Sequence, residues 1–191
     1  MLEKSITCYW LSKDRKDNYV PFQSLSKRQM TPSDYTRIFD YNKKILRAFF
    51  LKLSSMPWEL VAKNMEASQH SMKNIFVHLL VVYDGWLYRN DEEMKKDVPW
   101  QDYKGESYYS MKEVGVFMDK VVKNVDLTLN GLTEEKLHSS VKAPWFDVSM
   151  KLSDALMQVT FEQANHIGEI IALMWQRNIE PPDMMWFDNM P

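Results

Sequence analysis

The chain has 191 residues, and its 24 basic residues nearly balance its 26 acidic residues, which leaves a formal net charge of −2. This length suits one domain with a sizeable core, and the charge balance gives no electrostatic footprint for nucleic acid or for an anionic membrane. Cys8 is the lone cysteine, so no intramolecular disulfide can form, and no apolar run is long enough to span a membrane. We therefore expect a cytoplasmic protein whose partners are small molecules or other proteins.

The first 31 residues mix aromatic and charged side chains without a sustained period. This pattern predicts an irregular N-terminal arm, residues 1–31, packed on the domain formed by residues 32–191. The domain begins where helix signals appear, because Thr31 or Ser33 can cap a helix and Pro32 suits its first turn. The predicted first helix ends before Pro57.

Apolar residues recur at helical spacing in the first predicted helix, at Tyr35, Ile38, Phe39, Ile45, Leu46, Phe49, Phe50 and Leu53. A second helix is predicted from Ser68 or Ser71 to about Tyr88, and a polar loop follows it. A third helix is predicted from Ser107 or Ser110 to near Gly131. Its expected core positions are Val114, Phe117, Met118, Val121, Val122 and Val125.

The fourth predicted helix runs from a cap at Ser153 to about Arg177, after a long connection or short helical turn over residues 132–151. Asn178 is a plausible stop signal, and the two prolines that follow forbid continuation. The apolar residues 184–187 form a tail that we expect to fold back or to meet a partner. Four helices, no convincing strand and only five glycines predict an all-α four-helix bundle.

The fourth predicted helix places polar groups inside an apolar stripe, at Glu162, His166 and Glu169. Residues four apart on a helix share one face, so Glu162 and His166 have the spacing at which two ligands can bind one metal ion. His78 lies within the apolar span IFVHLLVV of the second helix. If these helices pack together, His78, Glu162 and His166 form a site of two histidines and one carboxylate.

Less specific interpretations of these residues remain open. A single histidine in an apolar helix is usually a core residue with satisfied hydrogen bonds, and the spacing of Glu162 and His166 also occurs on solvated helix faces. Trp86, Trp100, Trp145 and Trp175 could line a pocket or serve only in packing, and Gln163 and Asn165 could be hydrogen-bond partners of the site.

Two segments, VHLLVVYDGWL and NHIGEIIALMWQRNIEPPD, resemble the DinB/YfiT-like superfamily of metal-binding four-helix bundles. The resemblance extends from about Tyr35 to Phe187. It implies three divalent-metal ligands, usually histidines, which fall on His78, Glu162 and His166. Glu162 stands where the family usually has histidine. The substitution either permits an oxygen ligand and shifts the preference toward harder ions such as manganese, iron or zinc, or marks a site that has lost its metal.

The resemblance also implies a function and an assembly. Members of the superfamily include thiol-dependent transferases and isomerases, in which the metal ion would activate a low-molecular-weight thiol toward an electrophilic small molecule. The family usually binds zinc or nickel, and Glu162 adds manganese and iron as candidates in this chain. The resemblance further implies a homodimer. The alternatives are a metal-dependent hydrolase with Glu169 as candidate base, and a non-catalytic metal-binding or dimeric interaction protein. Glu169 could equally orient a histidine or act as an extra ligand.

Overall fold

The computed structural model describes residues 29–87, 104–143, 145 and 147–189. Its long helices are α1 (Pro32–Ser54), α3 (Met72–Trp86), α4 (Met111–Asn130) and α6 (Leu152–Trp175). Its short elements are α2 (Trp58–Val61), η3 (Gly105–Ser107), α5 (Glu134–Leu137), β1 (Ser140–Val141), β2 (Met150–Lys151) and α7 (Trp186–Asn189). Of the predicted arm, residues 1–28 lie outside the described residues.

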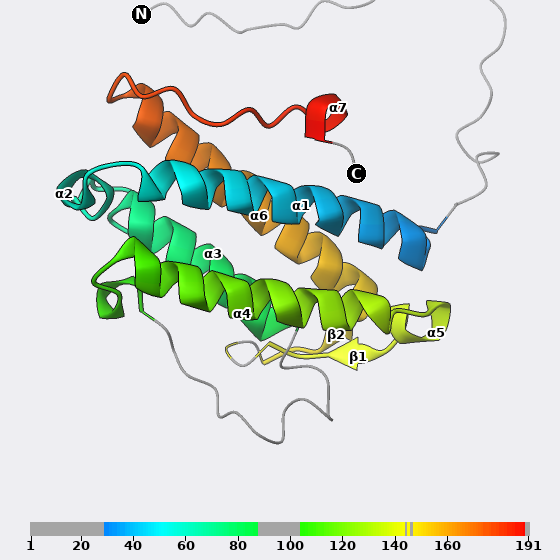
Figure 1. Cartoon of the computed structure of the whole chain (residues 1–191). Coiled ribbons are helices and arrows are strands. Elements are labelled where there is room, and N and C mark those ends of the chain that lie inside the picture. The colour runs from blue at the N-terminus through cyan, green and yellow to red at the C-terminus, as the bar shows by residue number, and fades with distance from the viewer. Residues whose placement is uncertain (1–28, 88–103, 144, 146, 190–191) are drawn as a thin grey trace, which may run out of the picture.

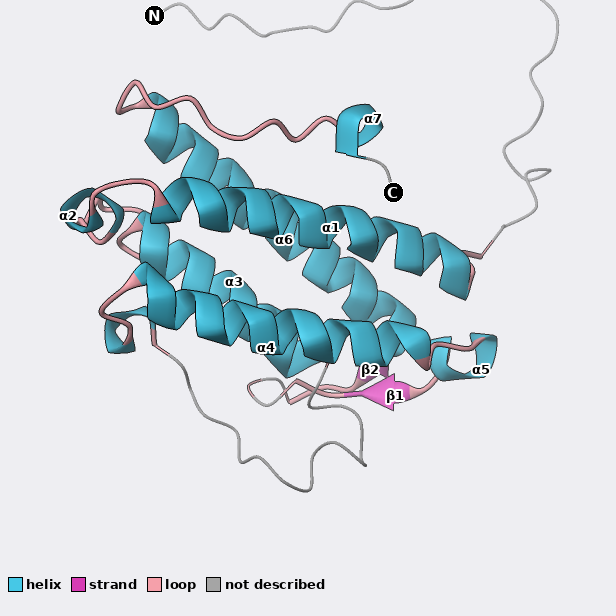
Figure 2. Ribbon diagram, viewed as in Figure 1, coloured by secondary structure: helices cyan, strands magenta, loops and turns pink. Residues whose placement is uncertain are grey.

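The long helices form a four-helix bundle, which confirms the predicted fold class. Around the bundle, α1 packs against α4, α4 against α3, α3 against α6, and α6 against α1. The colours of Figure 1 show that α1 and α6 run in one direction, whereas α3 and α4 run in the other. The two short strands lie together at one edge of this helical body (Figure 2). Within the described ranges, no helix combines the length and apolar content that crossing a membrane requires.

The helix starts follow the predicted signals at three of the four long helices. Thr31 caps α1 in a reciprocal arrangement with Asp34, Ser71 caps α3, and Ser110 caps α4. Each such cap stabilises a helix by about 1 kcal/mol, because it satisfies a backbone N–H group that the helix leaves unpaired. In both cases where two serines were candidates, the second serine is therefore the cap.

The predicted cap at Ser153 is wrong. The N-cap of α6 is Lys151, which makes no side-chain capping bond, because β2 leads directly into the helix. Ser153 instead lies in the first turn, where its carbonyl oxygen accepts a hydrogen bond of 3.3 Å from the Tyr35 hydroxyl. The antiparallel pair of β1 and β2, which the sequence did not predict, occupies the connection before α6.

The predicted apolar positions of the long helices form one core, in which Ile38 and Phe50 are half-buried. A buried polar chain crosses this core. The Tyr83 hydroxyl donates to Oε1 of Gln163 at 2.6 Å, and the Gln163 amide donates to the Asn42 carbonyl at 3.2 Å. Burial raises the pKa of Tyr83, so its hydroxyl stays protonated and remains a donor. These hydrogen bonds connect α3 to α6 and α6 to α1, and so fix the three helices relative to one another.

The C-terminal tail folds back on α1, as one of the two predicted alternatives has it. Asn178 adopts a positive φ of 55° just after α6, which turns the chain at the predicted stop. The Tyr41 hydroxyl donates to the Met184 carbonyl at 2.6 Å, and the rings of Tyr41 and Trp186 lie 4.8 Å apart. The tail thus covers part of α1 that faces away from α4 (Figure 1).

Candidate metal centre

The bundle brings His78 of α3 together with Glu162 and His166 of α6. One potential ligand atom from each residue lies within 4.8 Å of the other two. Nε2 of His166 is 3.2 Å from Oε2 of Glu162. The imidazole rings of His78 and His166 meet edge to face, with centroids 4.8 Å apart and an interplanar angle of 81°. The juxtaposition expected from the sequence is therefore present in the fold.

Two helices position this cluster for simple geometric reasons. Glu162 and His166 are one turn apart on α6, so their side chains point along the same side of the helix. α3 packs against α6, and His78 is half-buried between the fully buried Val77 and Leu79. The imidazole of His78 therefore reaches α6 at the margin of the core.

The cluster lies at the boundary between the core and the solvent. The side chain of His166 is only 8% exposed, whereas that of Glu162 is 28% exposed. The amide of Gln158 donates to Oε1 of Glu162 at 2.7 Å, so the other carboxylate oxygen is the one that faces His166. The Glu162 carboxylate is therefore the more solvent-exposed part of the cluster, while the imidazole of His166 lies in the core.

Glu169 lies on the other side of the His166 ring. Its Oε2 is 3.5 Å from Nδ1 of His166, which is too long for a hydrogen bond. Ser68 donates to both carboxylate oxygens, through its backbone N–H at 2.7 Å and its hydroxyl at 2.6 Å. Burial alone raises the pKa of Glu169, but these two bonds and the neighbouring His166 outweigh it and hold that pKa below its usual range. Glu169 is therefore ionised at neutral pH.

The donor set fits a divalent transition metal. Two atoms bound to one ion at about 2.0–2.2 Å with tetrahedral or octahedral angles lie roughly 2.8–3.6 Å apart. The separation of 3.2 Å between His166 and Glu162 falls within that range. Among the described residues, Nδ1 of His166 is buried without a hydrogen-bond partner. It lies next to an ionised carboxylate, which is where the outer nitrogen of a ligating histidine usually finds its acceptor. The residues present thus suit a metal ion.

Metal binding at this cluster is expected to weaken in acid. Burial, and then the proximity of His166, lowers the pKa of His78 below its usual value of 6.5, although Glu162 and Glu169 oppose the shift. The neutral imidazole is the form that binds metal, so the affinity is present above the histidine pKa and is lost as the pH falls through it. We expect the dissociation constant for Zn²⁺ to rise as the pH falls below the ordinary histidine pKa of 6.5, and to rise about tenfold per pH unit once the pH lies below the lowered pKa of His78. An affinity that stays constant from pH 7.5 to pH 5 would contradict ligation by histidine.

Other predicted neighbours of the site have different roles. Gln163 belongs to the buried chain with Tyr83, so it does not support the metal cluster. Trp86 and Trp145 pack edge to face with ring centroids 6.2 Å apart, Trp175 is exposed, and Trp100 lies outside the described residues. The indole of Trp145 also fills the space above Gly85, where a Cβ atom would lie 2.1 Å from the ring.

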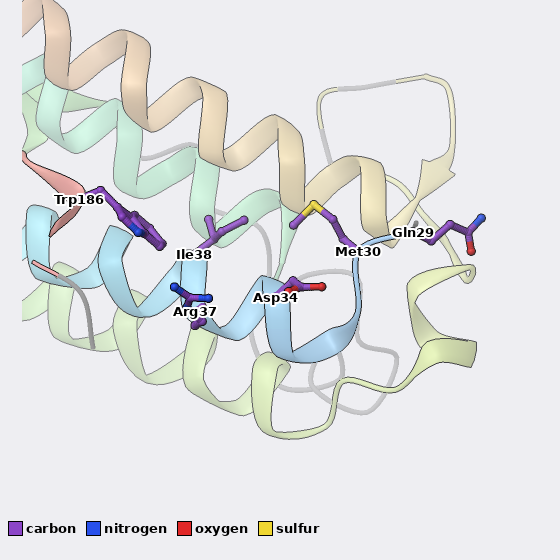
Figure 3. A pocket seen from close by; sticks show the side chains of 6 residues that line it. All are labelled: Gln29, Met30, Asp34, Arg37, Ile38 and Trp186. Atoms are coloured by element: carbon purple, nitrogen blue, oxygen red, sulfur yellow. The ribbon is translucent and has the colours of Figure 1, made fainter. Parts of the chain in front are cut away.

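Two cavities among the described residues lie near the start of α1. One of about 480 Å³ is lined by Gln29, Met30, Asp34, Arg37, Ile38 and Trp186 (Figure 3). A second, of about 240 Å³, shares Gln29 and Met30 and extends toward α5 and α6. Neither includes His78, Glu162 or His166, so the candidate metal centre is distinguished by its ligand chemistry and not by cavity size.

Fold and cluster together define an all-α bundle with a histidine and carboxylate group between two of its helices. The sequence profile of the DinB superfamily matches residues 28–170. The chain belongs to the DinB superfamily. A crystal structure of a DinB-like protein from Bacillus cereus ATCC 10987 is similar to it, with a TM-score of 0.54 and 19% sequence identity over 80% of this chain and 97% of that chain. At that identity the likeness concerns the fold. No curated protein matches the chain.

Proposed function

We propose that this chain is a divalent-metal-dependent enzyme that transfers a low-molecular-weight thiol to an electrophilic small molecule. The observation that carries the proposal is the convergence of His78, Glu162 and His166 at the edge of the core. A divalent ion held there would lower the pKa of a thiol placed at an open coordination position. The thiol specificity rests on the family resemblance, and the ligand set rests on the geometry.

Each of the three proposed ligands has a property that favours metal binding. His166 is fixed by burial and offers Nε2 toward Glu162. His78 is held in its neutral form by burial, which suits it for ligation without prior loss of a proton. Glu162 contributes one negative charge, so a divalent ion in this set retains a net positive charge that favours a bound anion such as a thiolate.

A titration with Co²⁺ tests the proposal, because a thiolate bound to cobalt absorbs strongly in the near ultraviolet. We expect the Co²⁺-loaded full-length chain to develop this absorption with glutathione, bacillithiol or mycothiol. S-methylglutathione, which has no free thiol, is the matched control and should produce no change. Stoichiometric metal binding without any thiol-dependent absorption would reject thiol transfer, whereas the absence of metal binding would reject the metal centre itself.

The two other candidate functions have weaker support. Hydrolysis would need a base, and the candidate Glu169 already accepts two hydrogen bonds from Ser68, which lower the pKa of its carboxyl group and weaken it as a base. A non-catalytic, dimeric interaction protein would need a surface for its partner. Phe161 and Trp175 are exposed on α6, and Gly168 lies between them in sequence. Among the described residues, no atom outside the local helix backbone lies within 4 Å of the position that a Cβ at Gly168 would take. These exposed residues do not identify the partner that would cover them, so the homodimer stays a prediction.

A further inference from the structure

The turn between α2 and α3 has a conformation that ordinary residues rarely adopt. Glu66 and His70 both have positive φ angles, 57° and 68°, although neither is glycine. The turn is held by its own hydrogen bonds, since Met65 N–H donates to the His70 carbonyl at 2.6 Å and His70 N–H donates to the Ala67 carbonyl at 2.9 Å. Backbone strain of this kind persists only where surrounding contacts fix it, and it is concentrated at functional sites.

Ser68 lies at the tip of this turn and reaches α6 across 101 residues of sequence. Its backbone N–H binds Oε1 of Glu169, and its hydroxyl binds Oε2 of the same carboxylate. Oε2 is also the oxygen that faces Nδ1 of His166 at 3.5 Å. The opposite edge of the same imidazole presents Nε2 to Glu162 at 3.2 Å. Successive contacts thus connect Ser68 to Glu169, Glu169 to His166, and His166 to Glu162.

We propose that Ser68 is a positioning residue, which holds the Glu169 carboxylate against Nδ1 of His166 and so directs Nε2 of that ring toward a divalent cation beside Glu162. The inference rests on the proposed metal centre and extends it to a residue on another element. Both oxygens of Glu169 are engaged in this arrangement. Glu169 therefore orients a ligand and serves neither as an additional ligand nor as a base.

A purely structural role for the same contact would be to anchor the turn on α6. The two roles differ in what a small change at Ser68 should do. Ser68→Ala removes the hydroxyl bond to Oε2 but keeps the backbone bond to Oε1, so the turn retains one of its two attachments. Ser68→Thr keeps the hydroxyl. If the contact acts through His166, the alanine variant loses metal affinity and the threonine variant does not.

The experiment measures Zn²⁺ affinity and the thermal midpoint of the metal-free protein for the full-length chain and its variants. We expect Ser68→Ala to weaken Zn²⁺ binding about tenfold and Glu169→Gln to weaken it by about 10- to 100-fold, as loss of a group that orients a histidine ligand usually does. The metal-free midpoint should stay unchanged in Ser68→Ala, and Ser68→Thr should restore wild-type affinity. Ser139→Ala, at an exposed serine after α5, is the matched control.

A spectroscopic measurement separates positioning from anchoring. In the Zn²⁺-bound wild-type protein, the proton on Nδ1 of His166 should give a slowly exchanging nuclear magnetic resonance signal, which Ser68→Ala should weaken or remove. Unchanged Zn²⁺ affinity in both Ser68→Ala and Glu169→Gln would overturn the positioning role and leave the metal centre standing. A fall in the metal-free midpoint that accompanies the loss of affinity would assign Ser68 to anchoring only. A wild-type chain that binds no divalent ion would overturn both proposals.

Discussion

His166→Ala is expected to abolish stoichiometric metal binding and to weaken the affinity for Zn²⁺ or Mn²⁺ by at least about 100-fold, because loss of a mere orienting group already costs about 10- to 100-fold. Of the three proposed ligands, His166 is the most deeply buried, with only 8% of its side chain exposed. α6 has no second histidine that could supply an imidazole nitrogen in its place. Metal content after purification without chelators, and a competition titration with a metal-sensitive dye, measure the effect.

The same substitution should remove the stabilisation that metal gives to the folded chain. At a free metal concentration about 100 times the dissociation constant, binding to the native state alone adds about 2.7 kcal/mol to the free energy of unfolding. For a chain of this size that corresponds to a rise of about 5–10 °C in the thermal midpoint. We expect the wild-type protein to show this rise with Zn²⁺ and His166→Ala to show none.

His138→Ala provides the control for these measurements. His138 is an exposed histidine just after α5, and it is not part of the candidate metal centre. Its removal should change neither metal content nor the metal-dependent rise in the thermal midpoint. If His166→Ala kept the metal affinity of the wild type, as His138→Ala should, the cluster would be a buried polar contact without a role in metal binding.

Local signals in the sequence are sufficient to predict the starts of α1, α3 and α4. The spacing of apolar residues and the caps at Thr31, Ser71 and Ser110 have their effect within one or two helical turns, so they can be recognised without the fold. The start of α6 cannot be predicted from such signals, because it depends on the pairing of β1 with β2. β1 and β2 have two residues each, too few to show a period of two, and only their contact fixes where α6 begins.

In the candidate site, too, local spacing predicts some of the contacts, whereas others depend on how the helices pack. Glu162 and His166 share a helix, so their spacing alone predicts that they lie on one face. His78 joins them in one site only if α3 and α6 are neighbours, which the sequence does not show. The sequence alone indicates Ser68 only as a candidate helix cap. Its contact with Glu169 spans 101 residues and depends on the left-handed residues of a turn that carries no glycine, so no local pattern indicated it.

The identity of residue 162 should set the metal preference of the centre. Glu162 offers an oxygen ligand beside two imidazoles, whereas the DinB-like pattern usually has histidine at this position. Glu162→His should therefore retain metal binding, because it replaces one ligand by another on the same turn of α6 and keeps the spacing of four residues to His166. Carboxylate oxygen suits Mn²⁺ better than imidazole does, and imidazole suits Zn²⁺ and Ni²⁺.

We expect the ratio of the Mn²⁺ dissociation constant to the Zn²⁺ dissociation constant to rise about tenfold in Glu162→His relative to wild type, since the nitrogen ligand favours the softer ion. Glu162→Gln, which keeps the shape but loses the charge, should weaken both ions and leave the ratio nearer to that of the wild type. Competition titrations of the three proteins with both metals measure these values. An unchanged ratio in Glu162→His, together with unchanged affinities in Glu162→Gln, would show that Glu162 is not a ligand and that its contact with His166 is only an ion pair at the edge of the core.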